Sequence, residues 1–385
     1  MVDRTITERE IVGDSRDEVR VSTLELFFDL VFVFTITQLT SVLAHHPNGI
    51  GVLHVGLMLV VIWWMYGGYA WLTNVVAPDR LAYQLLLLGG MAAFLVISLA
   101  IPTAFGNGGV AFGAAYLVVV LIHSGLFSRS QAGESGLAIL KLAPLNIVAA
   151  LAILAAGIAG GTARGVLWGI AVAVIILPAL RPPDPRFEIA PRHFVERHGL
   201  VVIVALGESV VAVGIGATAH ALTAGLVAVA VLGLALTAGL WWTYFGEGED
   251  EKALDAMRSA APGDRPRLAL NGFYHFHLLI LFGIIALASA LEIGIAHPGD
   301  PLAFARALAL GGGVASFLAG DALFRRALEI GELRWRLAAA PLALATIPLG
   351  TEVSAVTQLA ALVAVLLVCL MLEARARPAA VAAGP

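Results

Sequence analysis

The sequence predicts an all-α polytopic integral membrane protein, with about twelve transmembrane helices arranged as two parallel six-helix pseudo-repeats. Three observations carry this prediction. The chain is 59% hydrophobic and only 13% charged, whereas a soluble domain carries about a quarter charged residues. It contains a series of apolar runs long enough to cross a bilayer. Its basic residues alternate between these runs in the way typical of membrane proteins.

The helices follow from the apolar runs, since about 17–25 apolar residues cross a bilayer. The runs cover residues 24–43, 51–73, 81–101, 110–127, 137–158, 164–180, 199–219, 223–245, 268–292, 303–324, 334–349 and 353–372. They divide the chain into an N-terminal segment (1–22), a first six-helix repeat (23–180), a linker (181–198), a second repeat (199–373) and a tail (374–385).

The basic residues predict the orientation of these helices. If the N-terminus is cytoplasmic, every Lys and Arg except Arg164 and Arg306 falls in a cytoplasmic segment. Cytoplasmic loops of membrane proteins carry an excess of these residues. The predicted location is therefore a plasma membrane, with both termini in the cytoplasm.

Short motifs recur in the two halves in the same order. The sequence IWWMYGG at 62–68 is matched by LWWTYFG at 240–246, and DLVFVFTITQL at 29–39 aligns with GLVVIVALGES at 199–209. Pro144 and Pro341 fall in matching runs, and paired helix interruptions are typical of a transport path. An even number of helices in each half makes the proposed repeat parallel. The alternative is that apolar sequences resemble one another by composition.

The first run, ELFFDLVFVFTITQL, carries polar side chains into an apolar segment. Glu25 and Asp29 are four residues apart and so share one face of a helix, while Gln38 points to the opposite side. Both carboxylates lie in the first turns, where the helix dipole stabilises negative charge. In the alternative interpretation, Glu25 is an interfacial carboxylate that pairs with an arginine. Gln38 then makes only a hydrogen bond between helices. Asp29, one turn deeper, is a candidate ion or proton ligand.

The seventh run contains Glu208, which lies about 13 Å into the helix at about 1.5 Å per residue. A charge near the bilayer centre costs at least about 2.5–3.5 kcal/mol, so it must face protein or water. The repeat alignment sets Glu208 opposite Gln38. The functional interpretation is an ion or proton site, because burial favours the uncharged form of a carboxyl group. The alternative is a protonated glutamate that hydrogen-bonds a neighbouring helix.

Histidines and a charged cluster complete the candidates. His275 and His277 in the ninth run are two residues apart, which places them about 200° apart on a helix and excludes joint metal chelation. Either is a candidate proton acceptor, or a histidine that faces a headgroup or a neighbouring helix. The cluster Glu196-Arg197-His198, just before the seventh run, is interpreted as an interfacial anchor.

Several classes of function are disfavoured. The single cysteine, Cys369, excludes a disulfide framework and a cysteine-based metal site. No phosphate-binding loop, zinc-protease motif or nucleophile elbow occurs, which argues against an enzyme and predicts no cofactor. The net charge of −4 gives no indication of nucleic-acid binding.

Two segments, ELFFDLVFVFTITQL (25–39) and HFVERHGLVVIVALGES (193–209), resemble signature segments of the bacterial low-temperature-requirement A (LtrA) family, over Arg20 to about Glu373. The resemblance implies a multi-pass membrane protein from a family named for a cold-growth phenotype, and it supplies no substrate.

The first helix also resembles that of the endolysosomal and bacterial transmembrane potassium-channel family with a Phe-Ser-Asp motif. The resemblance lies in five residues, Phe27, Asp29, Phe32, Ile36 and Thr37, and Phe28 replaces the motif serine. It implies that Asp29 holds the helix in a polar network beside a conduction path.

The leading hypothesis is a transporter or channel for a small cation, or for a solute coupled to a cation or proton. Glu208 is the predicted central carboxylate, with Asp29 and Gln38 beside it and Glu25, His275 and His277 as further candidates. The alternative is a membrane protein that transports nothing, binds lipid or a partner, and supports the cell envelope at low temperature. Membrane lipids are the expected partners in either case, and a homo-oligomer is compatible with both.

Overall fold

The computed structural model describes residues 21–75, 80–129, 141–218, 221–294 and 299–376, and within these ranges it is built from helices and contains no strand. The α-helices are α2 (Thr23–His45), α3 (Gly49–Val75), α4 (Leu81–Ala100), α5 (Gly109–Arg129), α7 (Ala143–Ile158), α8 (Gly161–Ala179), α9 (Pro191–Ala217), α10 (Ala224–Phe245), α11 (Glu249–Ser259), α12 (Arg265–Leu268), α13 (His277–Gly294), α14 (Phe304–Leu328), α15 (Arg334–Ala345), α16 (Ile347–Glu352) and α17 (Ala355–Ala376). A π-helical segment, η3 (Ala269–Phe276), joins α12 to α13.

The predicted helical membrane protein is confirmed. Ten of the described helical segments are long and apolar enough to cross a bilayer, and α7 is a shorter apolar helix. Each of the twelve predicted runs contains helix, although the run 334–349 is divided between α15 and α16. The division falls at Thr346, and Pro348 in the first turn of α16 lacks the N–H that would continue the helical ladder. The predicted N-terminal segment and tail lie almost wholly outside the described residues.

The two matching prolines differ in their surroundings. Pro144 lies in the first turn of α7, where a proline costs no helical hydrogen bond. Pro341 lies inside α15. The expected pair of equivalent helix interruptions is therefore not present, and the six-helix repeat remains a prediction.

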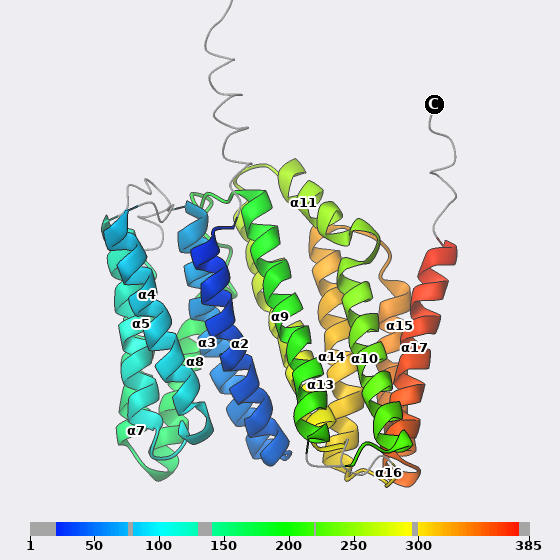
Figure 1. Ribbon diagram of the computed structural model, residues 1–385. Coiled ribbons are helices and arrows are strands. Elements are labelled where there is room, and N and C mark those ends of the chain that lie inside the picture. Colours follow the sequence, from blue (N-terminus) through cyan, green and yellow to red (C-terminus); the bar gives the residue numbers. More distant parts are fainter. Residues whose placement is uncertain (1–20, 76–79, 130–140, 219–220, 295–298, 377–385) are drawn as a thin grey trace, which may run out of the picture. The chain divides into compact units, whose positions relative to one another are not determined.

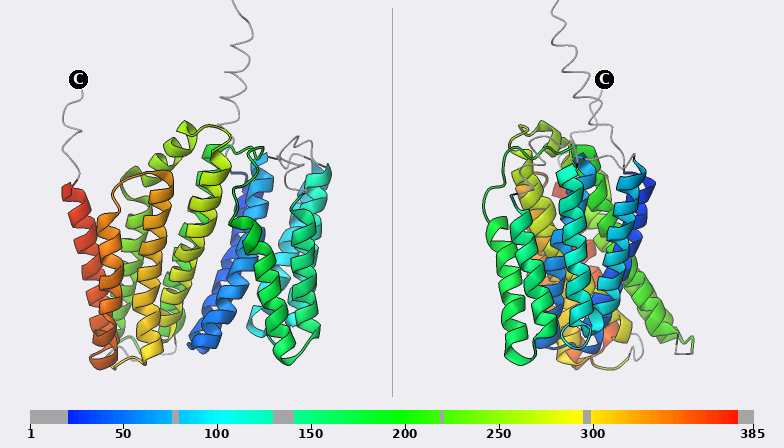
Figure 2. Two further views of the ribbon diagram at one scale, coloured as in Figure 1. Left: turned by 180° about the vertical axis from the view of Figure 1, so that it is seen from behind. Right: turned by 90° about the vertical axis from the view of Figure 1, so that its left-hand side faces the viewer.

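The first of two compact units comprises residues 1–39, 53–204 and 250–274. In it α4 packs on α5, α5 on α7 and α7 on α8, and these helices lie side by side from cyan to green in Figures 1 and 2. A Cβ atom on Gly109 of α5 would collide with Gly157 of α7, and the reverse also holds. Only glycine allows this close approach of two helix backbones.

The second unit comprises residues 40–52, 205–249 and 275–385. Here α13 packs along α14, α14 along α15, and α17 along both α10 and α15 (Figures 1 and 2). The contact of α13 with α14 again depends on small residues, because a Cβ on Gly283 would collide with the Gly313 carbonyl oxygen. The fold thus places polar side chains on helices that pack closely within each unit.

The predicted orientation can be measured with alkaline phosphatase fusions, since this enzyme is active only outside the cytoplasm. We expect a fusion after Asn107, between α4 and α5, to be active and a fusion after Pro183, between α8 and α9, to be inactive. An active fusion after Pro183 would contradict the predicted orientation. A cytoplasmic reporter such as green fluorescent protein, joined at the same two positions, should give the opposite pattern.

Candidate functional site

The site begins with Glu25, which has two roles in the structure. Its Oε2 accepts hydrogen bonds of 2.8 Å from both the backbone N–H and the hydroxyl of Ser22. The Glu25 N–H in turn donates to the Ser22 hydroxyl at 3.4 Å. This reciprocal pair is a capping box, which satisfies free backbone donors at the start of α2. The other carboxylate oxygen, Oε1, remains available to a neighbouring helix.

That neighbour is the first part of α9, where His193 and Arg197 lie four residues apart on one face. His193 Nε2 lies 2.8 Å from Glu25 Oε1, and Arg197 Nη2 lies 3.1 Å from Asp29 Oδ1. All four side chains are at most 3% exposed. The earlier residue of α2 pairs with the earlier residue of α9, and the later residue pairs with the later one. The two helices therefore run parallel where they meet. An arginine was considered as the partner of Glu25. The structure contains such an arginine, Arg197, but it pairs with Asp29.

The start of α9 also changes the interpretation of the charged cluster. Prolines 182, 183 and 185 precede the helix, which begins at Pro191, inside the segment predicted as a linker. Arg197 and His198 are therefore helical residues, and each is at most 2% exposed. The interfacial-anchor interpretation is wrong for these two residues, because tertiary pairing buries them, whereas Glu196 is exposed.

The helix α3 supplies the third side of the site. The Tyr66 hydroxyl donates to Asp29 Oδ1 at 2.7 Å. The Arg197 guanidinium lies 5.6 Å from the ring centroids of both Phe28 and Tyr66. Cation–π contacts of this kind help a guanidinium that has left water. Asp29 thus lies in a polar network, as the potassium-channel resemblance implies.

Asn74 of α3 sets the proton position on His193. Its Oδ1 accepts from the Ala190 N–H at 2.9 Å and its Nδ2 donates to the Ala190 carbonyl at 3.0 Å, which fixes the orientation of the amide. Nδ2 also lies 3.2 Å from His193 Nδ1. Because Nδ2 is only a donor, Nδ1 accepts, and the proton of a neutral ring lies on Nε2. Neutral His193 therefore donates to the Glu25 carboxylate.

We call Glu25, Asp29, Tyr66, Asn74, His193 and Arg197 the α2–α9 network. With neutral His193, its two carboxylates face one fixed cation, Arg197. Asp29 Oδ2 has no hydrogen-bond partner among the described residues, and neither do Nε and Nη1 of Arg197. A small cavity of about 10 Å³ borders Glu25 and Arg197, close to the smallest volume that holds a water molecule. Two buried carboxylates and one guanidinium thus meet beside this small cavity.

The second unit contains a separate set of buried charges. Arg336 binds both oxygens of Glu373 at 2.8 and 3.2 Å and also contacts Asp321. Arg325 pairs with Glu249 at 2.8 Å and lies 3.7 Å from Asp321. We call these five side chains the Arg336 network. Each is at most 5% exposed. None of the five was predicted as a site residue, because they lie near the predicted ends of helices, where a charge is ordinarily solvated.

The predicted site residues fall into different surroundings. Glu25 and Asp29 come together in the first unit, where Gln38 is half-buried outside their network. Glu208 is 2% exposed and belongs to the second unit. His277, also in the second unit, is fully buried, and its Nε2 lies 2.7 Å from the Tyr244 hydroxyl, whereas His275 is half-buried.

The recurring Trp-Trp-x-Tyr motifs contain a signal that sequence reasoning overlooked. In both motifs the tyrosine makes a buried polar contact, since the Tyr66 hydroxyl bonds Asp29 and the Tyr244 hydroxyl bonds His277. Among the described residues, no group of three or more His, Cys, Asp or Glu side chains has the geometry to hold a metal ion.

The fold and the buried ionic networks define the class of this protein: it is a multi-pass, helical integral membrane protein. The model of the family "Bacterial low temperature requirement A protein (LtrA)" matches residues 20–371, and the chain belongs to this family. It is 29% identical over 327 residues to "Uncharacterized protein RA0937" of Rhizobium meliloti (strain 1021), which covers 81% of this chain and 79% of that protein. No solved structure matches the chain.

Proposed function

We propose that this protein is a proton-coupled transporter of the bacterial plasma membrane, and that Asp29 carries the proton. The supporting observation is the α2–α9 network, in which two buried carboxylates share one fixed cation, Arg197. An unbalanced buried charge is costly, and proton uptake removes the imbalance. Ionisable residues inside membrane segments are commonly proton relays.

The contacts of Asp29 suggest how proton uptake changes the structure. The carboxylate accepts from Tyr66 and pairs with Arg197 through Oδ1, which leaves Oδ2 for the proton. Protonation removes the charge that attracts Arg197 across the interface between α2 and α9. The paired and unpaired states then differ in how tightly the two helices are held. Glu208, predicted from the sequence as the central carboxylate, lies further along α9 and is proposed as a further carboxylate of the proton path.

A second candidate function is a membrane protein that binds lipid and transports nothing. An aromatic cavity in the first unit, lined by residues that include Trp64 and Trp71, favours it. This candidate predicts no proton movement coupled to any solute.

The transport proposal is tested in proteoliposomes that contain a pH-sensitive dye, under an imposed proton gradient. External Na⁺, K⁺, phosphate and single-chain organic anions are added in turn. We expect one of these solutes to cause proton movement, and Asp29→Asn to slow it roughly tenfold or more, because the neutral amide cannot exchange a proton. Proton movement at the normal rate in Asp29→Asn would overturn the assignment.

Two further variants make the measurement specific. Glu196→Gln removes an exposed carboxylate from the same helix as Arg197 and should leave the rate unchanged. Glu208→Gln tests the second predicted carboxylate and should also slow proton movement. Thermal unfolding of each variant in detergent identifies any loss of rate that comes from misfolding.

A further inference from the structure

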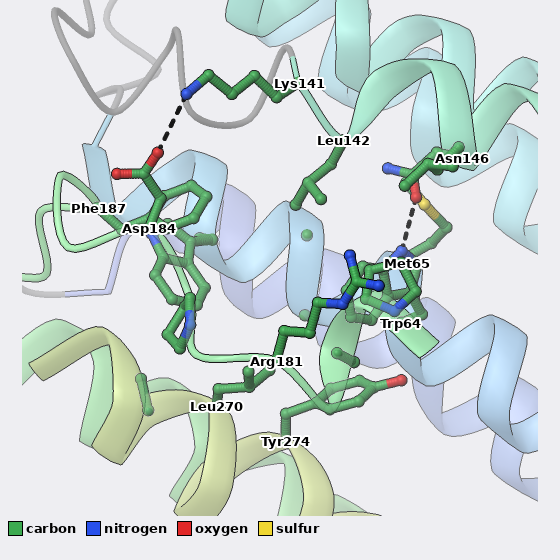
Figure 3. Close-up of a pocket in the computed structure, with 18 of the residues that line it drawn as sticks. Trp64, Met65, Lys141, Leu142, Asn146, Arg181, Asp184, Phe187, Leu270 and Tyr274 are labelled. Carbon is green, nitrogen blue, oxygen red and sulfur yellow. Dashed lines mark hydrogen bonds and ion pairs between the residues drawn. The ribbon is translucent and has the colours of Figure 1, made fainter. Parts of the chain in front are cut away.

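The first unit contains a cavity of about 350 Å³ that the α2–α9 network does not use. Its walls come from the second half of α3, the ends of α5 and α8, the starts of α7 and α9, the segment between α8 and α9, and η3 (Figure 3). On the predicted topology, these segments place the mouth of the cavity on the cytoplasmic side. The volume is near the lower end of the range of about 300–1,000 Å³ typical of small-molecule sites.

The walls are mainly apolar and aromatic. Trp64, Trp71, Phe187, Phe194 and Tyr274 all line the cavity. The Trp64 ring is held in place by a 2.8 Å hydrogen bond from its Nε1 to Asn146 Oδ1, drawn in Figure 3. Large rigid rings of this kind bury the apolar body of a ligand at little cost in side-chain entropy. The volume is sufficient for a single chain or a small ring system.

A buried imidazole gives an independent indication of a ligand. His123 lines the cavity and is 3% exposed. The Gly68 backbone is a hydrogen-bond partner of this ring, and no side chain among the described residues bonds either of its nitrogens. Its ring packs edge-on against Phe127, with centroids 5.0 Å apart. Buried polar atoms are nearly always hydrogen-bonded in native proteins, so a ring with no side-chain partner beside a cavity offers a nitrogen to a polar group that binds there.

The mouth of the cavity is positively charged. Lys141 lies 3.4 Å from Asp184, and Arg186 also binds Asp184, with its Nε 2.8 Å from Oδ1. Hydrogen bonds from Arg186 hold the pKa of the Asp184 carboxyl below its usual range. The negative charge of Asp184 is therefore already paired with a cation. Arg181 has no ion pair within the described part of the chain, and Figure 3 shows its side chain extending from the segment after α8 into the cavity.

We propose that this cavity binds a single-chain anionic amphiphile, a molecule with one carboxylate or phosphate end and one apolar body. Arg181 and Lys141 hold the anionic end, the aromatic walls cover the apolar body, and His123 hydrogen-bonds a polar atom within it. Charge complementarity at the mouth selects an anion over a cation or a neutral alcohol. The inference goes beyond the proposed function, because binding is measured without transport.

The test uses the protein in lipid nanodiscs and the quenching of tryptophan fluorescence by 11-bromoundecanoate. We expect saturable quenching that is lost when Trp64 and Trp71 are both replaced by phenylalanine. The matched probe 11-bromoundecanol, which has the same chain without the charge, should show only the non-saturable quenching of bilayer partitioning. Equal, non-saturable quenching by both probes would overturn the proposal.

Variants at the mouth test the recognition of the anion. Arg181→Ala should weaken the apparent affinity for bromoundecanoate about tenfold, as expected for loss of a charge-assisted hydrogen bond. Arg181 is exposed, so this variant should fold normally. Arg334→Ala, at an exposed arginine of the second unit, is the control and should bind normally. Unchanged affinity in Arg181→Ala would overturn the assigned orientation of the ligand.

Competition distinguishes the source of the ligand. Displacement by lysophosphatidate indicates a membrane lipid product, and displacement by free dodecanoate indicates a soluble carboxylate, and either supports the proposal. Displacement of bromoundecanoate by inorganic phosphate at the same concentration would show a simple anion site. It would overturn the proposal that the ligand is an amphiphile. Because the readout is binding, a negative result here leaves the proton-movement test of Asp29 unaffected.

Discussion

Arg336→Ala is expected to destabilise the folded protein by about 3–5 kcal/mol, the usual effect of removing one partner from a buried ion pair. Arg336 holds both oxygens of Glu373 and also contacts Asp321. Its loss leaves two carboxylates without their principal cation in a region where each side chain is at most 5% exposed. At roughly 2 °C per kcal/mol for a large domain, the midpoint of thermal unfolding in detergent should fall by about 6–10 °C.

Arg334 provides the matched control on the same helix. It pairs with Glu332 at 2.8 Å, but the two side chains are 63% and 47% exposed. Exposed ion pairs contribute at most about 1 kcal/mol, so Arg334→Ala should shift the midpoint by no more than about 2 °C. Equal shifts for the two variants would show that burial does not set the contribution of Arg336.

Arg197→Ala is expected to cause a similar loss of stability in the first unit. A second substitution, at Asp29, tests whether the stranded carboxylate is the cause. The substitution strands the Asp29 carboxylate, which is 3% exposed and keeps only its hydrogen bond from Tyr66. We expect a loss of about 3–5 kcal/mol. The double variant Asp29→Asn/Arg197→Ala contains no stranded charge and should be more stable than Arg197→Ala alone.

This comparison is a double-mutant cycle, which isolates the interaction between the two side chains. Arg192→Ala, one turn earlier in α9 at a half-buried position, controls for loss of an arginine from this helix. If Asp29→Asn adds to the destabilisation by Arg197→Ala, the ion pair is not the reason that Arg197 is required. Thermal unfolding monitored by size-exclusion chromatography is sufficient for the four proteins of the cycle and for the Arg192→Ala control.

The sequence predicted the helices well because the signal for a membrane helix is local. Every predicted apolar run contains helix, although the charged helix α11 lies outside all of these runs, and the spacing of Glu25 and Asp29 correctly placed them on one face. The helix boundaries were less predictable. The first residues of α9 are polar, so the apolar run begins at 199, whereas the helix begins at Pro191.

The partners of the acidic residues depend on tertiary structure, which is why sequence reasoning missed them. His193 and Arg197 are separated from Glu25 and Asp29 by more than 160 residues, and a single sequence contains no signal for such a pairing. A charged residue next to an apolar run is ordinarily solvated, and this expectation gave the wrong interpretation of Arg197. The cavity and the burial of His123 beside it likewise arise only when several helices meet.

Asn74 joins the two sites of the first unit. Its amide is bonded to the backbone of Ala190 and to His193, and Ala190 ends the same segment that begins at Arg181 beside the cavity. A ligand that shifts this segment would therefore alter the donor that fixes the His193 tautomer. Thermodynamic linkage then requires reciprocity: any change in proton affinity caused by the ligand equals the change in ligand affinity caused by the proton.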